Sequence, residues 1–474
     1  MMADRFLAAA RDIVGEAHVL CDDAIEPRFL EAARYGHGAA RAVVRPETDE
    51  QVARLLALAA GGDVRLIPQG AHTGLVQGAT PRDARRDVVL STDRLRSTFD
   101  LDPLDATLRV SAGFRLGEVN ERLREHGLQF PVDLSADPSI GGMLATNTGG
   151  TRMMRYGDVR ANTLGLTVAV AHPVGELLHF TPALPKNNAG IDAKHLFIGT
   201  GGAFGVVVEA VLRLHRLPRQ RVVAMVALES IASLWPFYQA ACDAFGDSIS
   251  AFEGISGRAL ELALQHVPSL RAPFESGPPA HAVLLELSSA FGPDDLHLEQ
   301  VLSDFLETTL ERAWIVDAVV GSGEALWALR HAISEGLRAH GDVMGLDLSF
   351  PRRAYAEFIA EACAWLSTWT PDVQLADFGH LGDGGVHFNL VWPHGALSAA
   401  QRGEMRARLY ELAATHGGCF SAEHGVGPHV QAAYEAHTPR AQLALARRLA
   451  GALAPAGEIG TMRYAAGAPE KVYQ

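Results

Sequence analysis

Apolar residues recur along this chain in two spacings, one typical of helices and one typical of strands. Helical spacing runs through residues 1–37, 116–126 and 439–453, where apolar residues three or four apart share one face. Thr48 and Gln51 form a capping box that predicts the start of a further helix. Short apolar runs typical of buried strands occupy residues 41–45, 64–68 and 88–92.

A second pattern begins after Pro218. Strand-like runs such as residues 222–228 and 282–288 alternate there with long helical stretches such as residues 298–314, which favours a separate α+β domain. We expect four parts: an N-terminal helical segment (1–37), a first domain (38–217), a second domain (218–425) and a C-terminal segment (426–474) that packs back on the first domain.

The composition is that of a globular protein. The 474 residues are 48% hydrophobic and 20% charged, which suits two or three domains with their own cores. With 41 basic and 55 acidic residues the net charge is −14, and this excludes wholesale nucleic-acid binding, because phosphate neutralisation needs a basic face. The four cysteines form no CxxC pair, so neither a disulfide framework nor a thiolate metal site is indicated. Since the sequence has no signal-peptide pattern and no apolar stretch long enough to span a bilayer, we expect a cytoplasmic protein.

Two glycine-rich stretches are candidate anion-binding loops. Residues 68–75 (PQGAHTGL) directly follow a predicted strand, and residues 139–150 are SIGGMLATNTGG. Small residues let successive backbone N–H groups converge on an anion, although a pair of surface turns would have the same composition. Neither stretch has the spacing of the dinucleotide-binding fingerprint, so a Rossmann site is not indicated.

Taken together, four segments resemble a known family. They are RAVVRPETDEQV, PQGAHTGL, SIGGMLATNTGGTRMMRYGDVRANTLGL and GTGGAFGVVVEAVLRL. In this order they resemble the FAD-binding domain of the vanillyl-alcohol-oxidase (PCMH-type) superfamily, in its D-2-hydroxyglutarate and D-lactate dehydrogenase branch. The resemblance implies an α+β fold, with a PCMH-type FAD-binding domain over 38–217, an α+β cap domain with an antiparallel sheet that binds the substrate, and a C-terminal helical segment.

In that family the first loop holds the FAD pyrophosphate and the second lines the flavin. Some relatives attach FAD through a histidine near the first loop, but His72 falls one place short of that position, so we expect non-covalent FAD. The FAD-binding residues that the resemblance implies are Pro68, Gln69, Gly70, Ala71, His72, Thr73, Gly74, Leu75, Ser139, Gly141, Gly142, Thr146, Asn147, Gly149, Gly150, Tyr156, Gly157 and Val207.

The stretch HLGDGGVHFN is a candidate metal site. His380 and His387 are seven residues apart and would face opposite sides of a straight strand, but the Gly-Asp-Gly-Gly between them favours a tight turn that folds both imidazoles toward one point. Glu423 and His424, in AEHGVG, add a carboxylate and a third imidazole. Two histidines and a carboxylate suit a divalent metal, although surface histidines around a glycine turn would give the same pattern.

The resemblance favours the metal reading of these two motifs. HLGDGGVHFN and AEHGVG are similar to motifs of the same branch, and they imply that His380, His387 and Glu423 ligate a divalent metal. The resemblance further implies that Asn389 contacts the substrate and that His424 is the general base. Zinc is favoured for such a ligand set.

A predicted helix, LWALRHAIS, carries the candidate substrate-binding residues. Arg330 and Ser334 are four residues apart and share one helix face, and a guanidinium suits carboxylate recognition, although a solvated helix face would look the same. The family places an arginine and a hydroxyl residue here to bind the substrate carboxylate. It also has a lysine where this chain has Gly345, so the sequence leaves the identity of the 2-hydroxy acid open.

These expectations combine into one reaction. We expect oxidation of a D-2-hydroxy acid to the 2-oxo acid: a bound cation lowers the pKa of the substrate hydroxyl, His424 takes its proton, and FAD accepts the hydride. The partners are then a small-molecule 2-hydroxy acid and an unidentified electron acceptor, and a homodimer is compatible with the sequence. The alternatives are a non-redox flavoenzyme resembling alkylglycerone-phosphate synthase, a metal hydrolase whose glycine-rich loops are structural, and a non-catalytic binding protein that keeps the fold.

Overall fold

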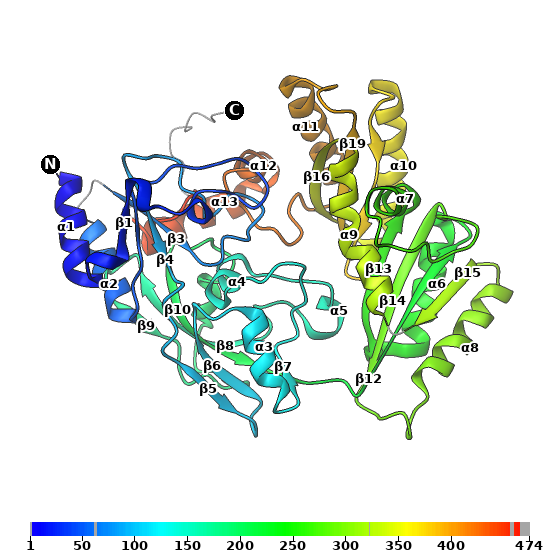
Figure 1. Cartoon of the computed structure of the whole chain (residues 1–474), viewed down its shortest axis with the longest axis horizontal. Helices are drawn as coiled ribbons and strands as arrows, with labels where there is room; N and C mark the ends of the chain where they lie inside the picture. The colour runs from blue at the N-terminus through cyan, green and yellow to red at the C-terminus, as the bar shows by residue number, and fades with distance from the viewer. Residues whose placement is uncertain (1, 61–63, 322, 456–458, 465–474) are drawn as a thin grey trace. The chain divides into compact units, whose positions relative to one another are not determined.

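The computed structural model describes residues 2–60, 64–321, 323–455 and 459–464, and it divides into two compact units (Figure 1). The first unit comprises Met1–Gly149, Asp158–Arg216 and His424–Gln474. The second comprises Gly150–Gly157 and Leu217–Glu423. The short segment Gly150–Gly157, which follows the second glycine-rich stretch, therefore clusters with the second unit rather than with its sequence neighbours.

The first unit is built on two main sheets. One has the strand order β1-β2-β4-β3, in which β2, β4 and β3 are parallel and β1 is antiparallel to β2. The other has the order β5-β6-β10-β8-β9 and is antiparallel throughout. The strands are β1 (Val19–Cys21), β2 (Ala42–Val44), β3 (Arg65–Gln69), β4 (Asp87–Ser91), β5 (Phe99–Asp102), β6 (Thr107–Ser111), β8 (Thr163–Val170), β9 (Leu177–His179) and β10 (Gly205–Arg213), with a small pair formed by β7 (Leu128–Gln129) and β11 (His215–Arg216).

Helices cover both sheets of this unit. The apolar faces of α1 (Met2–Val14) and α2 (Asp49–Ala59) pack on each other and on buried residues of β2, β3 and β4. The second sheet buries its apolar residues against α3 (Leu116–Arg124) and α4 (Ile140–Thr146). The C-terminal part of the unit contributes α12 (Gln431–His437) and α13 (Arg440–Leu453).

The periodic segments of this unit form the elements that their patterns predict, with one exception at the N-terminus. Helical spacing over residues 1–37 predicts helix throughout, but among the described residues only α1 is an α-helix there. Val19–Cys21 instead forms β1, because its backbone pairs in antiparallel register with Ala42–Val44. The rest of this segment contains three short 3₁₀ helices, Glu16–His18, Asp22–Ala24 and Pro27–Phe29. Tertiary pairing therefore overrides the local preference.

The second unit contains one large antiparallel sheet. Its strand order is β15-β12-β14-β13-β18-β19-β16, and β17 also pairs with β19. The strands are β12 (Gln220–Leu228), β13 (Ile249–Ser256), β14 (His281–Ser289), β15 (Ile315–Gly321), β16 (Asp342–Ser349), β17 (Gln374–Leu375), β18 (Phe378–Gly379) and β19 (Gly385–Trp392).

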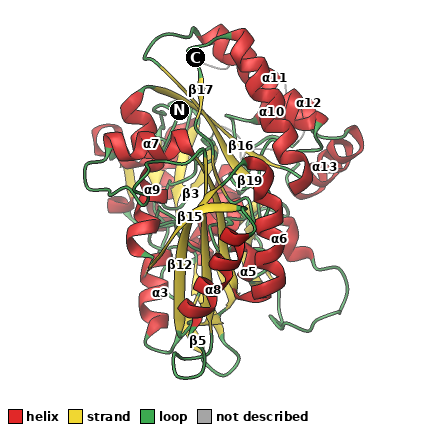
Figure 2. Ribbon diagram, turned by 90° about the vertical axis from the view of Figure 1, so that its right-hand side faces the viewer, coloured by secondary structure: helices red, strands yellow, loops and turns green. Residues whose placement is uncertain are grey.

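Helices cover the two faces of this sheet. The neighbouring helices α7 (Gly257–His266) and α9 (Glu324–His340) share a core with alternate residues of β12, β13 and β14. Helices α6 (Leu234–Phe245) and α8 (Leu298–Glu311) pack near β12, β13 and β15, as Figure 2 shows for α8. Helix α10 (Arg352–Trp369) packs on that same face, beside α11 (Ala399–Thr415). The ring centroid of Phe358, on α10, lies 5.2 Å from that of Phe388, on β19.

The α+β fold with an antiparallel sheet in the second unit matches the expected fold class. The short helix α5 (Met153–Tyr156) is fixed to this sheet by two arginines. Arg152 forms an ion pair with buried Glu286, 3.0 Å from Nε to Oε1, and Arg155 bonds to Ser288.

Candidate active site

The two histidines of HLGDGGVHFN lie on a hairpin between β18 and β19. Gly384 has a φ of +94°, a conformation that glycine adopts without strain. The N–H of Gly385 donates to the carbonyl of His380 at 3.0 Å, which closes the turn. His380 directly follows β18 and His387 lies on β19, and their ring centroids are 5.1 Å apart. The glycine-rich turn therefore brings both imidazoles together, as its sequence predicts.

The adjacent strand β16 positions the carboxylate of Glu423. The loop before Glu423 runs antiparallel to the end of this strand, starting at the bridge between Cys419 and Ser349. The N–H of Ala422 then donates to the carbonyl of Asp347 at 3.2 Å, and the N–H of Glu423 donates to its Oδ2 at 3.0 Å. Since Asp347 is directly opposite His387 across the ladder, these bonds bring Glu423 to the histidine hairpin.

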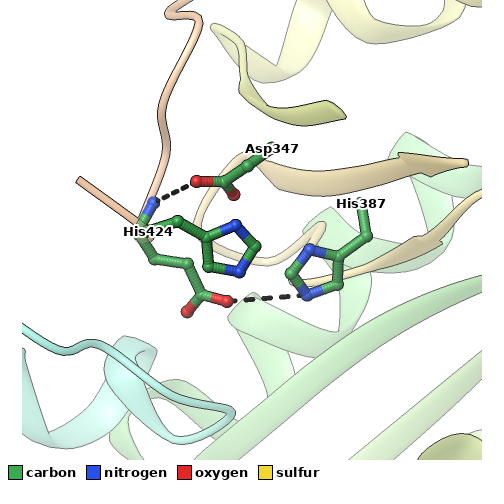
Figure 3. Close-up of side chains that lie close together, drawn as sticks. Asp347, His387 and His424 are labelled. Carbon is green, nitrogen blue, oxygen red and sulfur yellow. Dashed lines mark hydrogen bonds and ion pairs between the residues drawn. The ribbon is translucent and has the colours of Figure 1, made fainter. Parts of the chain in front are cut away.

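The side chains converge on one carboxylate oxygen. Oε1 of Glu423 lies 3.6 Å from Nε2 of His380 and 3.5 Å from Nε2 of His387. Asp347, His387, Glu423 and His424 each offer one ligand atom, and these atoms all lie within 4.8 Å of one another. Figure 3 shows the imidazoles of His387 and His424 side by side, with a carboxylate joined to His387. Nitrogen and carboxylate donors this close together suit a divalent cation, so the residues present fit a metal.

The division of the chain into two units falls on the peptide bond between Glu423 and His424. His424 is therefore assigned to the first unit and Glu423 to the second, although the two residues are adjacent in the sequence. It is one of the four residues that could hold an ion, and it is also the residue expected to act as the base.

The buried carboxylate of Glu253 contacts the hairpin at His380. Oε1 of Glu253, on β13, lies 2.7 Å from Nδ1 of His380, and its Oε2 accepts from Nε of Arg330 at 2.7 Å. Burial alone would lower the pKa of His380, but the carboxylates of Glu253 and Glu423 hold it well above its ordinary value. Burial likewise favours the neutral form of Glu253, yet the charges of His380 and Arg330 lower its pKa. Without a bound cation, the opposite charges of the two groups therefore favour each other.

The candidate substrate residues differ in their surroundings. Arg330, on α9, is buried, and its guanidinium lies 4.4 Å from the ring centroid of Phe378. Ser334, one turn further on, is exposed. Asn389 is buried, its side-chain amide donates to the carbonyl of His387 at 3.1 Å, and it faces Gly345 across the ladder. Arg330 and Asn389 thus lie beside the metal-ligand candidates, whereas nothing in the described structure ties Ser334 to them.

The first glycine-rich stretch joins the end of β3 to a loop. The side chain of Gln69 is buried and donates to the carbonyls of Phe29 and Ala79 at 3.0 and 2.8 Å, so it braces the loop. His72 has a φ of +57°. Its Nδ1 lies 3.0 Å from the carbonyl of Arg28 and its Nε2 2.9 Å from Oγ1 of Thr80, so both ring nitrogens are engaged by the chain.

The second stretch is a helix where the sequence suggests a loop. Ser139 caps α4 by accepting a hydrogen bond from the N–H of Gly142 at 3.2 Å. Glycine normally disfavours helix, but a Cβ at position 141 would lie 2.7 Å from Cβ of Ala112, so close packing requires glycine there. The helix ends at Asn147, whose φ is +52° and whose side chain bonds Asp158 at 2.8 Å.

The remaining FAD candidates occupy varied positions. Thr146 donates to the carbonyl of Gly142 at 3.0 Å, Gly149 is buried, and Val207 packs in the core of the first unit. Gly150, Tyr156 and Gly157 belong to the segment that clusters with the second unit.

The two glycine-rich stretches meet in a way that suits a phosphate group. A Cβ on Gly70 would overlap Oγ of Ser139, so the first loop lies directly against the start of α4. In the part of the chain that the structure describes, no carbonyl accepts a hydrogen bond from the backbone amides of residues 71–75. A run of such donors beside a capped helix is the chemistry that anions need, and the residues therefore fit the pyrophosphate of FAD.

Comparison with known proteins decides the family. Residues 40–181 match the family described as FAD binding domain, and residues 217–459 match the C-terminal domain of FAD linked oxidases. A D-2-hydroxyglutarate dehydrogenase of Xanthomonas citri pv. viticola is 36% identical over 395 residues, which are 81% of this chain and 81% of that protein. The chain belongs to the FAD-linked oxidase family. It is an FAD-dependent dehydrogenase, so the synthase, hydrolase and non-catalytic alternatives are set aside.

Two further comparisons agree with this result. The mitochondrial D-2-hydroxyglutarate dehydrogenase of Bos taurus is 32% identical over 457 residues, covering 95% of this chain and 81% of that protein. A solved structure of p-cresol methylhydroxylase with substrate bound superposes with a TM-score of 0.72 at 14% identity, over 96% of this chain and 95% of that one. This last likeness shows that the dehydrogenase has the PCMH-type fold. Within the described residues, no helix is both long and apolar enough to cross a membrane.

Sequence reasoning missed two residues of the site, Asp347 and Glu253. Each is a carboxylate flanked by apolar or small residues, in the runs GLDLS and AFEGI. A charged residue in a strand that is buried on both faces needs a partner, and this was the available signal. Their partners lie on other strands and on α9, so the sequence did not identify them.

Proposed function

We propose that the dehydrogenase oxidises a D-2-hydroxy acid to the 2-oxo acid, that His380, His387 and Glu423 would hold a divalent metal at the site, and that FAD is the redox cofactor. The observation that carries this proposal is the approach of both imidazoles to one oxygen of Glu423, at 3.6 and 3.5 Å. The relatives named as D-2-hydroxyglutarate dehydrogenases support the substrate class.

Different residues of the chain would have different roles in this reaction. His380, His387 and Glu423 would hold the cation, and Asp347 lies close enough to be a further ligand or to orient Glu423 through its N–H. His424 would take the hydroxyl proton at a ring nitrogen, because a neutral imidazole is a competent base near neutral pH. Arg330 and Asn389 would bind the carboxylate end of the substrate. When bound, the cation supplies Lewis acidity and FAD supplies the hydride acceptor.

We infer that the FAD is bound without a covalent link through His72. Both ring nitrogens of this histidine are occupied, one near a backbone carbonyl at 3.0 Å and the other near a threonine hydroxyl at 2.9 Å. Burial also lowers the pKa of His72, which keeps the ring neutral. A covalent bond at either nitrogen would break one of these contacts.

The strand pairing beside the proposed ligands supports a proposal about the size of the substrate. Gly345 and Asn389 form the pair next to Asp347 and His387, and no side chain projects from position 345. A second charge partner for a distal carboxylate is therefore missing on this strand. We propose that the enzyme accepts D-2-hydroxy acids with a small or apolar end as well as dicarboxylates.

Zinc is the favoured cation, and the domain limits and the cytoplasmic location remain predictions.

The test is a substrate panel. The FAD-loaded enzyme is assayed with D- and L-2-hydroxy acids of increasing length and an artificial electron acceptor, before and after treatment with a chelator. We expect turnover with D-acids alone, loss on chelation, and recovery with Zn²⁺, Mn²⁺ or Co²⁺. Turnover that survives complete removal of metal would refute the metal role, and turnover of L-acids alone would refute the stereochemistry.

A further inference from the structure

A fully buried carboxylate on β13 joins two groups of the proposed site. The side chain of Glu253 is 1% exposed, and each of its two oxygens has a separate partner. Oε1 lies 2.7 Å from Nδ1 of His380, and Oε2 accepts from Nε of Arg330 at 2.7 Å. One rigid group therefore contacts both a candidate metal ligand and a candidate substrate-binding residue.

The bond to His380 determines which ring nitrogen can face a cation. A carboxylate accepts hydrogen bonds and cannot donate them, so the proton of His380 is held at Nδ1. The opposite nitrogen, Nε2, is the atom that lies 3.6 Å from Glu423. A carboxylate behind a metal-binding histidine fixes both the tautomer and the ring orientation.

The packing around Glu253 leaves its side chain little room for another position. β13 and β18 pair at Gly254 and Gly379, and a Cβ on Gly254 would overlap Leu381 of the hairpin. The hairpin thus lies directly on β13. On the other side, Arg330 is held over the ring of Phe378 at 4.4 Å, and Phe378 pairs with His387 across the ladder.

We propose that Glu253 is a positioning residue that sets the metal-binding tautomer of His380 and the orientation of Arg330 together, so that metal affinity and substrate affinity depend on one carboxylate. This inference rests on the proposed function, because it takes His380 as a ligand and Arg330 as a substrate contact. Glu253 itself would touch neither metal nor substrate.

The decisive variant is Glu253→Gln, which keeps the shape and removes one acceptor. The amide oxygen can accept from Arg330 or from His380, but the NH₂ group must then face the other donor. If the NH₂ group of the glutamine faces Nδ1 of His380, the proton of His380 moves to Nε2. Nε2 then has no lone pair to offer the cation. We expect Co²⁺ affinity to fall by roughly 10- to 100-fold, the range typical of lost support to a ligand.

The chain offers a matched control in Glu286, on the adjacent strand β14. Its side chain is 2% exposed and forms an ion pair with Arg152, and it also accepts from Ser250 and from Trp327. Glu286→Gln therefore removes an equally buried, arginine-paired carboxylate from the same sheet without touching either histidine. Its Co²⁺ affinity and Co²⁺ absorption spectrum are expected to equal those of the wild-type enzyme.

The experiment measures Co²⁺ affinity by competition with a chromophoric chelator, the Co²⁺ absorption spectrum, and KM against kcat. Weaker Co²⁺ binding, an altered spectrum and a raised KM in E253Q, with E286Q unchanged, support the proposal. Wild-type Co²⁺ binding in E253Q, or equal loss in both variants, overturns it. If E253Q does not fold, Glu253→Asp replaces it: its carboxylate is one methylene shorter and cannot reach both partners, so unchanged Co²⁺ affinity there overturns the proposal. A wild-type enzyme that binds no Co²⁺ refutes the metal role itself, which is a separate failure.

Discussion

Substituting Gly70 by alanine tests whether the two glycine-rich stretches form one FAD site. Gly70 has no positive φ, so its backbone would accept alanine, but the added Cβ would overlap Oγ of Ser139 and lie 3.3 Å from its Cβ. Ser139 cannot turn away freely, because this oxygen accepts the hydrogen bond that caps α4 at 3.2 Å. Either the cap is lost or the two stretches move apart.

The size of the effect follows from these two routes. Loss of a serine N-cap costs about 1 kcal/mol, and overpacking of a closely packed contact costs roughly 1–3 kcal/mol. We expect Gly70→Ala to lower the free energy of unfolding of the FAD-free protein by about 1–2 kcal/mol, the lower part of that range. FAD affinity should fall further, by roughly tenfold for each 1.4 kcal/mol needed to bring the stretches together again.

The assay combines urea unfolding of the FAD-free protein with FAD titration by flavin fluorescence. Gly78→Ala is the matched control, because a Cβ there meets nothing within 4 Å and the residue is not among the FAD candidates. Ser139→Ala removes the overlapping oxygen, so Gly70→Ala should cost less in that background than alone. Equal stability and equal FAD affinity of the Gly70 and Gly78 variants would refute the proposed contact between the stretches.

Three further predictions concern the metal, the base and a carboxylate outside the site. His387→Ala and Glu423→Ala should abolish flavin reduction by substrate while the flavin spectrum shows that FAD stays bound; reduction at the wild-type rate would remove these residues from the ligand set. His424→Ala should lower kcat by about 10²- to 10⁴-fold, the usual contribution of a general base, with metal content measured by atomic absorption unchanged; loss of metal in this variant would make His424 a ligand instead. Burial and the neighbouring charge of Glu209 raise the pKa of Asp49 to about 6. The folded protein therefore binds this proton more tightly than the unfolded chain does. The stability that this group contributes is lost as the pH rises from about 4 to 6. Asp49→Asn should therefore become more stable relative to the wild type by about 1 kcal/mol between pH 4 and pH 7, after allowance for solvent screening of a half-exposed group, and a pH-independent difference in urea unfolding would contradict this.

Local pattern was sufficient for much of the fold. Residues 64–68 and 88–92 are short apolar runs, and they form the parallel neighbours β3 and β4. The glycines between His380 and His387 predict a turn, and the structure has a turn at this place. In each case the information lies within a few consecutive residues.

Other features depend on partners that are distant in the sequence. Helix α4 contains two glycines and would be weak in isolation, but its packing on Ala112 accepts only glycine at position 141. Glu253 acquires its environment from His380, 127 residues away, and from Arg330. Arg330 itself is buried against a carboxylate, which the spacing of Arg330 and Ser334 on one helix face did not indicate.

The most direct measurement of the central claim is anaerobic mixing of the FAD-loaded enzyme with one D-2-hydroxy acid, with the flavin absorption followed in the metal-loaded and metal-free forms. We expect the flavin to be bleached within one turnover when metal is present, the 2-oxo acid to appear in equal amount, and the metal-free form to stay oxidised. Equal bleaching of both forms, or no bleaching by any D-2-hydroxy acid, would contradict it.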